Sequence, residues 1–193
     1  RVSAPDITTD SAAAGVLTQR EHRATPLRAR GDSVVARSSE SMGVVGRAPL
    51  SGWRVWIADD DDTTARVAAL VVRRSGATTR TFADGAQLVA AIEAGLDDAV
   101  GEGHAVSMGD LQDLPDGVLV DGRMPVMGGV DAIRAIVALG NDRVPWWRPR
   151  LWLVTGEVTP EVESEAMRAG ADGVLCKPVT GAVVVASLLS DTA

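Results

Sequence analysis

At four places in the sequence, a polar side chain ends or follows a short apolar run. Four aspartates, residues 59–62, follow the run WRVWIA, and Asp121 follows GVLV. Thr155 ends the run LWLVT, and Lys177, the only lysine in the chain, follows GVLC. Carboxylates that lie close together raise one another's pKa unless a cation keeps them ionised. Oxygen ligands with no histidine or cysteine among them favour Mg²⁺ over zinc.

The hydroxyl and the ammonium indicate which chemical group such a cation would help to bind. A divalent cation, a hydroxyl and an ammonium around one carboxylate form a site for a group with several negative oxygens, and a phosphoryl group fits best. Lysine is a compact point charge, whereas the planar arginine fork is wider and requires bidentate geometry. A narrow position that already holds a metal and carboxylates therefore favours a lysine. This explains why Lys177 is present in a chain that otherwise uses arginine for its permanently charged basic side chains.

Strands and helices alternate from Trp53 onward, and the strands are short and largely apolar. This pattern is typical of a doubly wound α/β fold, in which helices cover both faces of a parallel sheet. Because functional groups collect at the carboxyl ends of such strands, we expect the four polar positions to meet at one edge. We predict strands over 53–58, 78–82, 117–120, 151–155 and 173–176, and helices over 63–74, 84–95, 128–140, from 159–160 onward and over 180–189.

Composition divides the chain near Ser51. Residues 1–50 hold seven arginines and five acids, whereas residues 51–193 hold twelve basic side chains and twenty-one acids. The first segment lacks a sustained apolar period, so we interpret it as a linker or tail with little core of its own. No apolar run approaches the length of about 18 residues that a membrane span requires. We expect a cytoplasmic location with no membrane contact by this segment.

The four motifs resemble those of the receiver domains of two-component response regulators. They occur in the expected order over about residues 53–190: DD after the first strand, VDGRMPVMGG around Asp121, VTG at Thr155 and CKP at Lys177. The resemblance implies a flavodoxin-like fold with five parallel strands in the order 2-1-3-4-5. It also implies a phosphorelay partner, either a histidine kinase or a histidine phosphotransfer protein. No effector domain follows the last helix, so we expect either a receiver from a hybrid histidine kinase or a stand-alone regulator.

The same resemblance assigns roles to the motif residues. Asp121 would be the phosphoacceptor and would accept the phosphoryl group as an aspartyl phosphate. Asp59 and Asp60 would hold Mg²⁺ together with Asp121 and the backbone carbonyl of Arg123. Beyond this self-phosphorylation and dephosphorylation, we do not expect the domain to act as an enzyme in its own right.

Lys177 would contact the phosphoryl group, and Thr155 would turn its hydroxyl toward it as a switch. The bond before Pro178 is typically cis in this family, which would direct Lys177 back into the site.

Four positions depart from the common pattern or vary within it. Where receivers often carry an aromatic switch residue, this chain has Val174, so an aromatic flip cannot report phosphorylation. Gly156 replaces a common alanine after the switch hydroxyl, which we expect to loosen that loop. Arg123 and Glu157 occupy the variable positions that tune loss of the phosphoryl group. We hypothesise that they pair across the mouth of the site and obstruct the attacking water.

Two segments, about residues 96–116 and 141–150, are longer than in a minimal receiver. The second contains Trp146 and Trp147 beside several arginines. These side chains would either form a partner or nucleic-acid patch or cap the bottom of the sheet. We favour the cap and expect no direct contact with nucleic acid, because the domain is acidic and repels a polyanion. The last helix, apolar almost all round, is a candidate homodimer surface.

Two other functions fit part of the pattern. A pseudo-receiver would keep the fold as a binding module without phosphorylation. A haloacid-dehalogenase-like phosphatase would use DDDDT, residues 59–63, as its nucleophile motif, but it needs a further acidic motif well beyond Lys177, and only sixteen residues follow it. His22 lies in HRATPL, which resembles the phosphoaccepting box of a sensor kinase only weakly, and His104 is interpreted as a surface loop residue.

Overall fold

A computed structural model describes residues 47–101 and 106–190 of the chain. Within them, strands and helices alternate as predicted, and their bounds agree with the predicted ranges at most ends. His22, His104 and most of the predicted tail lie outside the described residues. The elements are β1 (Arg54–Ala58), α1 (Asp62–Arg74), β2 (Thr78–Phe82), α2 (Gly85–Val100), β3 (Gly117–Asp121), α3 (Gly129–Arg143), β4 (Arg150–Thr155), α4 (Pro160–Ala169), β5 (Gly173–Cys176) and α5 (Gly181–Leu189).

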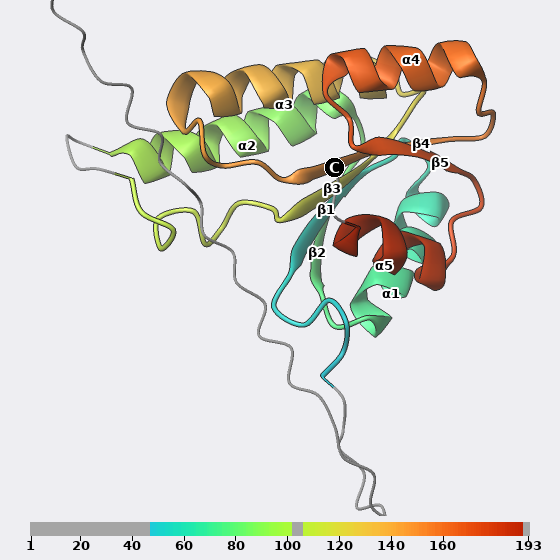
Figure 1. Cartoon of the computed structure of the whole chain (residues 1–193), viewed down its shortest axis with the longest axis horizontal. Coiled ribbons are helices and arrows are strands. Elements are labelled where there is room, and N and C mark those ends of the chain that lie inside the picture. The colour runs from blue at the N-terminus through green and yellow to red at the C-terminus, as the bar shows by residue number, and fades with distance from the viewer. Residues whose placement is uncertain (1–46, 102–105, 191–193) are drawn as a thin grey trace, which may run out of the picture. The chain divides into compact units, whose positions relative to one another are not determined.

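The five strands form one parallel sheet in the order β2-β1-β3-β4-β5 (Figure 1). This is the predicted flavodoxin-like order. Ala58 at the end of β1 pairs with Val120 on β3, and Val120 pairs with Leu153 on β4. The carboxyl ends of β1, β3 and β4 are therefore level with one another, and the residues that follow them meet at one edge of the sheet.

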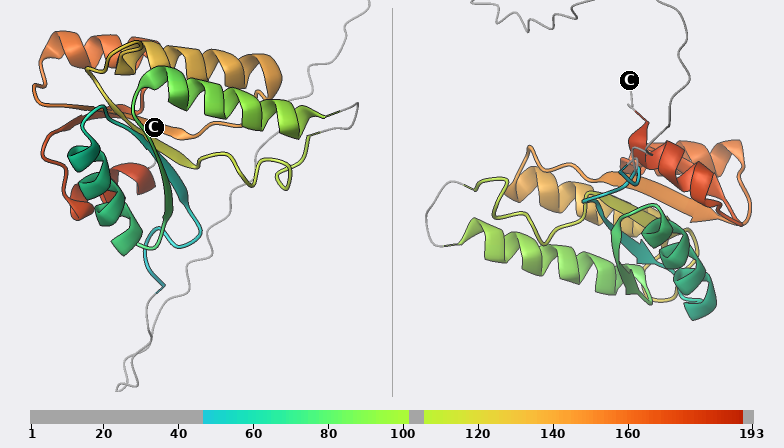
Figure 2. Two further views of the ribbon diagram at one scale, coloured as in Figure 1. Left: turned by 180° about the vertical axis from the view of Figure 1, so that it is seen from behind. Right: turned by 90° about the horizontal axis from the view of Figure 1, so that it is seen from below.

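Helices cover both faces of the sheet. Figures 1 and 2 show α2, α3 and α4 on one face and α1 and α5 on the other. Successive residues of β3 point to opposite faces, so Val118 and Val120 pack in the core under α2 and α3, whereas Leu119 packs in the core under α1 and α5. Burial on both faces explains why residues 117–120 of β3 are all apolar rather than alternating.

Packing against the core already includes Leu50, one residue before the predicted boundary at Ser51. Leu50 is fully buried in the core beside α1 and α5, and its backbone N–H donates to the carbonyl of Ser75 over 2.8 Å. A single apolar residue in a polar segment has no period to reveal it in sequence. The folded unit therefore includes residues just before Ser51.

The prediction that the second helix ends at Gly95 is wrong, because α2 continues to Val100. Gly95 is there for packing instead: a Cβ on it would lie 2.7 Å from the side chain of Leu114. Leu111 and Leu114 return to the core beside α2, so much of the longer connection into β3 is packed rather than free. In the part of the chain that the structure describes, no helix is long and apolar enough to cross a membrane.

Candidate functional site

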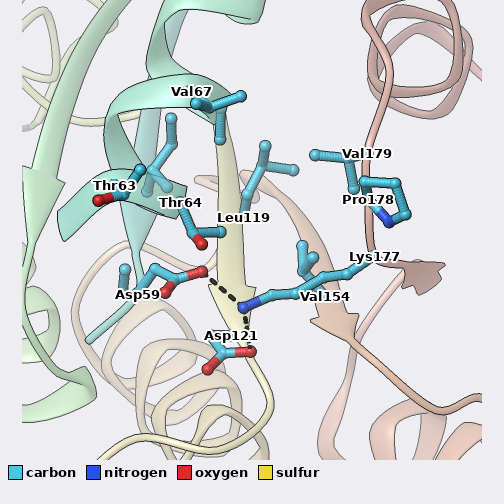
Figure 3. Close-up of a pocket in the computed structure, with 13 residues that line it drawn as sticks. Asp59, Thr63, Thr64, Val67, Leu119, Asp121, Val154, Lys177, Pro178 and Val179 are labelled. Carbon is cyan, nitrogen blue, oxygen red and sulfur yellow. Dashed lines mark hydrogen bonds and ion pairs between the residues drawn. The ribbon is translucent and has the colours of Figure 1, made fainter. Parts of the chain in front are cut away.

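The ammonium of Lys177 lies between two buried carboxylates at the carboxyl edge of the sheet (Figure 3). Its Nζ is 2.7 Å from Oδ2 of Asp59 and 2.9 Å from Oδ1 of Asp121. These aspartates are only 6% and 8% exposed. Three side chains that are far apart in sequence therefore meet, as the order of the strands requires.

Local structure directs Lys177 toward this point. Thr155 on β4 pairs with Cys176, the last residue of β5, and the backbone N–H of Lys177 donates to the carbonyl of Thr155 over 2.7 Å. The peptide bond between Lys177 and Pro178 is cis, the isomer expected from the family resemblance. The chain turns here toward α5, while the lysine side chain extends across the strand ends to Asp121.

Electrostatics keep the lysine charged. Partial burial opposes its charged form, but the hydrogen bonds to Asp59 and Asp121 outweigh this effect and raise the pKa of Lys177 above its ordinary value. The ammonium therefore stays protonated at neutral pH and offsets part of the repulsion between the two buried carboxylates.

The donors at this edge fit a hard divalent cation. Asp59, Asp60 and Asp121 each offer a carboxylate oxygen, and these oxygens all lie within 4.8 Å of one another. Asp60 is exposed, so the group is open to solvent on one side. The carbonyl of Arg123 accepts no backbone hydrogen bond within the described residues and is free to act as a ligand. An all-oxygen set of this kind suits Mg²⁺.

The remaining two aspartates of the DDDD run have other contacts. Asp61 is the N-cap of α1, and its Oδ1 accepts the backbone N–H of Thr64 over 2.7 Å. Hydrogen bonds from Thr64 lower the pKa of Asp61. Asp62 lies in the first turn and forms an exposed ion pair with Arg66 over 2.8 Å. Only the first two aspartates of the run therefore belong to the acidic group.

Thr155 lies beside the site, but its hydroxyl contacts its own loop. It donates to the carbonyl of Glu157 over 3.2 Å and accepts the backbone N–H of the same residue over 3.3 Å. A Cβ on Gly122, the residue after the central aspartate, would lie 3.5 Å from the Cβ of Thr155. The threonine thus lies next to the loop that leaves β3, and its hydroxyl is free to change partner.

The three positions predicted to tune the site differ in burial. Arg123 and Glu157 are exposed, and among the ion pairs of residues 47–101 and 106–190 none joins them. Their pairing is not formed in this structure, and their effect on dephosphorylation stays a prediction. Val174 is half-buried and packs against the core under α2, α3 and α4.

Gly129 is a positioning residue that the sequence reasoning missed. It begins α3, and a Cβ on it would lie 2.3 Å from the carbonyl oxygen of Asp121 and 2.7 Å from the side chain of Leu153. The helix can approach the backbone of the central aspartate only because this residue has no side chain. The glycine pair at the start of the predicted helix, residues 128–129, was the available signal in the sequence.

A second missed feature is a cavity of about 370 Å³ next to the ammonium. Thr63, Thr64 and Val67 of α1 line one side, and Val154 and Val179 line the other (Figure 3). Val67 is 54% exposed although it is apolar. Helical periodicity in the sequence does not show that an apolar residue is exposed, so it does not indicate this cavity.

The fold and this site together define a signalling receiver domain. Over residues 55–189 the sequence matches the family described as response regulator receiver domain, and the chain belongs to this family. Among curated proteins, no relative matches the chain.

Solved structures of receivers share the fold. The receiver domain of the histidine kinase CKI1 from Arabidopsis thaliana, complexed with Mg²⁺ and BeF₃⁻, is 25% identical, with a TM-score of 0.61 over 70% of this chain and 88% of that one. The same domain complexed with Mg²⁺ is 24% identical, with a TM-score of 0.64 over 75% and 96%. The receiver of the putative response regulator NarL from Mycobacterium tuberculosis is 24% identical, with a TM-score of 0.54 over 72% and 94%.

Proposed function

We propose that this receiver accepts a phosphoryl group from a phosphohistidine onto Asp121 and uses it to change its partner interactions. The observation that carries the proposal is the position of the Lys177 ammonium, 2.9 Å from a carboxylate oxygen of Asp121 at the edge of an acidic group. The same ammonium would contact an oxygen of the incoming phosphoryl group and stabilise its charge.

The proposed transfer is a displacement reaction at phosphorus. A carboxylate oxygen of Asp121 forms a bond to phosphorus, the bond from phosphorus to the donor imidazole nitrogen breaks, and the neutral imidazole leaves after taking up a proton. Asp59 and Asp60, with Asp121 and the carbonyl of Arg123, would hold Mg²⁺, which when bound neutralises charge on the transferred group. Asp121 is already oriented by its ion pair to Lys177, so little rearrangement precedes the attack.

Thr155 supplies the switch in this proposal. Its hydroxyl would leave the backbone of Glu157, which it now contacts on both the donor and acceptor side, and would donate to a phosphoryl oxygen. The loop between β4 and α4 would then lose two local hydrogen bonds and adopt a second arrangement. Replacing Thr155 by valine should leave phosphoryl uptake largely intact and reduce the loop response, measured from backbone amide chemical shifts of residues 155–159.

The proposed donor is a histidine kinase or a histidine phosphotransfer protein, and the proposed location is the cytoplasm. The likeness to a receiver that belongs to a histidine kinase favours a hybrid kinase as the parent protein. A homodimer through α5 is a further part of the proposal, because Val183 and Leu189 on that helix are 46% and 45% exposed.

The direct test is phosphorylation by acetyl phosphate in Mg²⁺, followed by intact mass. We expect the wild type to gain one phosphoryl group, and we expect Asp121→Asn and the chelated wild type to gain none. Binding of a beryllofluoride mimic provides a second readout that does not depend on turnover. Uptake that persists in Asp121→Asn would place the acceptor elsewhere. No uptake and no beryllofluoride binding by a folded wild type would favour the pseudo-receiver.

The phosphatase alternative is not favoured. The family match is to receivers, and in the dehalogenase motif the third residue would be Asp61. Its carboxylate is the cap of α1 and accepts the Thr64 N–H, so it is engaged at the start of that helix.

A further inference from the structure

A second cleft lies at the opposite edge of the sheet from Asp121. Its volume is about 570 Å³, within the range typical of small-molecule sites. It is lined by residues at the amino ends of β1 and β4, by Asp116 just before β3, and by parts of the two longer connections. Since the strands are parallel, their amino ends lie one strand length away from the phosphoacceptor edge. The cleft is therefore separate from the site described above.

Aromatic side chains form much of its wall. Of the five tryptophans in the chain, three line this cleft: Trp53, Trp146 and Trp147. Trp147 is half-buried, and its ring packs against Gly140, where a Cβ would lie 3.4 Å from it. Trp147 therefore packs against α3. Trp146 has a different environment, because it is 49% exposed, and Met108 on the other long connection is 76% exposed.

The charges in the cleft leave one guanidinium uncompensated. Arg54 is neutralised by Asp116, which lies 2.9 Å away and accepts from its side chain and its backbone N–H. Arg150 has Asp172 at 3.6 Å. Arg148 is exposed and, within the part of the chain that the structure describes, has neither an ion pair nor a hydrogen bond.

We propose that this cleft binds a small flat aromatic carboxylic acid. The carboxylate would pair with the guanidinium of Arg148, and the ring would contact the exposed face of Trp146. Arginine presents a planar fork that matches a carboxylate bidentately, so a monoanion with an adjacent ring uses both features of the cleft.

Net charge argues against a nucleic acid as the ligand. Residues 51–193 carry twelve basic and twenty-one acidic side chains, so the domain as a whole repels a nucleic acid strand. A single carboxylate is attracted by the nearby guanidinium of Arg148 more strongly than it is repelled by the distant acidic side chains. Salt screens the interaction between charges that are more than about 10 Å apart. The proposal does not depend on phosphorylation, since none of its residues belongs to the phosphoacceptor edge.

The test uses three indole probes that differ in charge, titrated against the full chain. Indole-3-acetate is an anion, indole-3-acetamide is neutral and tryptamine is a cation. We expect the order of affinity to be acetate, then acetamide, then tryptamine, measured from saturation-transfer signals of the probe and from the shift of the indole N–H of Trp146. Equal affinity for all three probes, or no binding of indole-3-acetate at millimolar concentration, would overturn the proposal.

Matched variants identify the residues involved. Arg148→Gln should weaken indole-3-acetate binding about tenfold and change acetamide binding little, because only the charge-assisted contact is lost. Arg168→Gln removes the same charge at an exposed arginine on α4. It should change the binding of neither indole-3-acetate nor indole-3-acetamide. Trp146→Ala should weaken both indoles. If Arg148→Gln and Arg168→Gln behave alike, the proposal is wrong.

A second copy of the chain is the competing occupant of the cleft. The proposal fails if three results occur together: the wild type self-associates at the working concentration, Trp146→Ala abolishes this association, and indole-3-acetate does not. The cleft would then be a protein interface. Sedimentation of the wild type and the variant, with and without the probe, separates the two. A monomer in every case, with binding that depends on Arg148, supports the aromatic acid.

Discussion

The ammonium of Lys177 and the carboxylate of Asp121, 56 positions apart in sequence, lie 2.9 Å from each other. The same ammonium lies 2.7 Å from Asp59, so it bridges two buried carboxylates. Without it, the negative charges of these carboxylates would not be compensated by this side chain. The ion pair thus offsets part of the repulsion between these carboxylates and orients the residue that we propose as phosphoacceptor.

Lys177→Met should reduce the free energy of unfolding in a chelating buffer by about 2 kcal/mol, because it leaves buried carboxylates unpaired. Arg66→Met, which removes an exposed pair with Asp62, should cost less than about 0.5 kcal/mol. Urea unfolding of the two variants checks this. Mg²⁺ should recover part of the loss in the lysine variant. Equal losses in the two variants would show that the bridge contributes little to stability.

Asp60→Asn should weaken Mg²⁺ binding about tenfold, since the charge of its ligands sets the affinity of such a site. It should change stability little in the absence of metal, because Asp60 is exposed. Asp62→Asn is the matched control: it removes the same charge two residues away but lies outside the acidic group. Calorimetric titration with Mg²⁺ measures both. A similar loss in the control would mean that general charge, rather than coordination, determines the affinity.

Gly129→Ala should destabilise the domain by about 2 kcal/mol, because its Cβ has no room beside the backbone of Asp121 and the side chain of Leu153. The same substitution at Gly156 should be neutral or stabilising by about 0.5 kcal/mol, since a Cβ there meets nothing within 4 Å. Thermal and urea unfolding give both values. A tolerated Gly129→Ala would show that α3 can move away from the phosphoacceptor edge.

Arg123→Ala should accelerate loss of the phosphoryl group severalfold if its side chain obstructs the attacking water. Arg123 is exposed and unpaired among the described residues, so the variant should fold normally. The decay of phosphorylated protein after removal of acetyl phosphate measures the rate, with Glu157→Ala as the companion variant. An unchanged or slower decay in Arg123→Ala would contradict the hypothesis.

Local patterns predicted most of the secondary structure because they depend on neighbours in sequence. Thr159 caps α4 and Pro160 begins it, as the sequence indicates. The helix end predicted at Gly95 was wrong because a glycine that makes room for Leu114 looks the same in sequence as a glycine that ends a helix. Which of the two roles applies is decided by a residue 19 positions away.

The motifs alone indicated the family, the chemistry of an oxygen-ligated cation and the central residues Asp121 and Lys177. Only the tertiary structure decided which of the four consecutive aspartates share one oxygen cluster, that the Thr155 hydroxyl contacts Glu157, and that a tryptophan-lined cleft opens at the other edge. The physical reason is that spacing along a strand is constant, whereas distances between strands depend on sheet order and on the packing of loops, and these are properties of the whole chain.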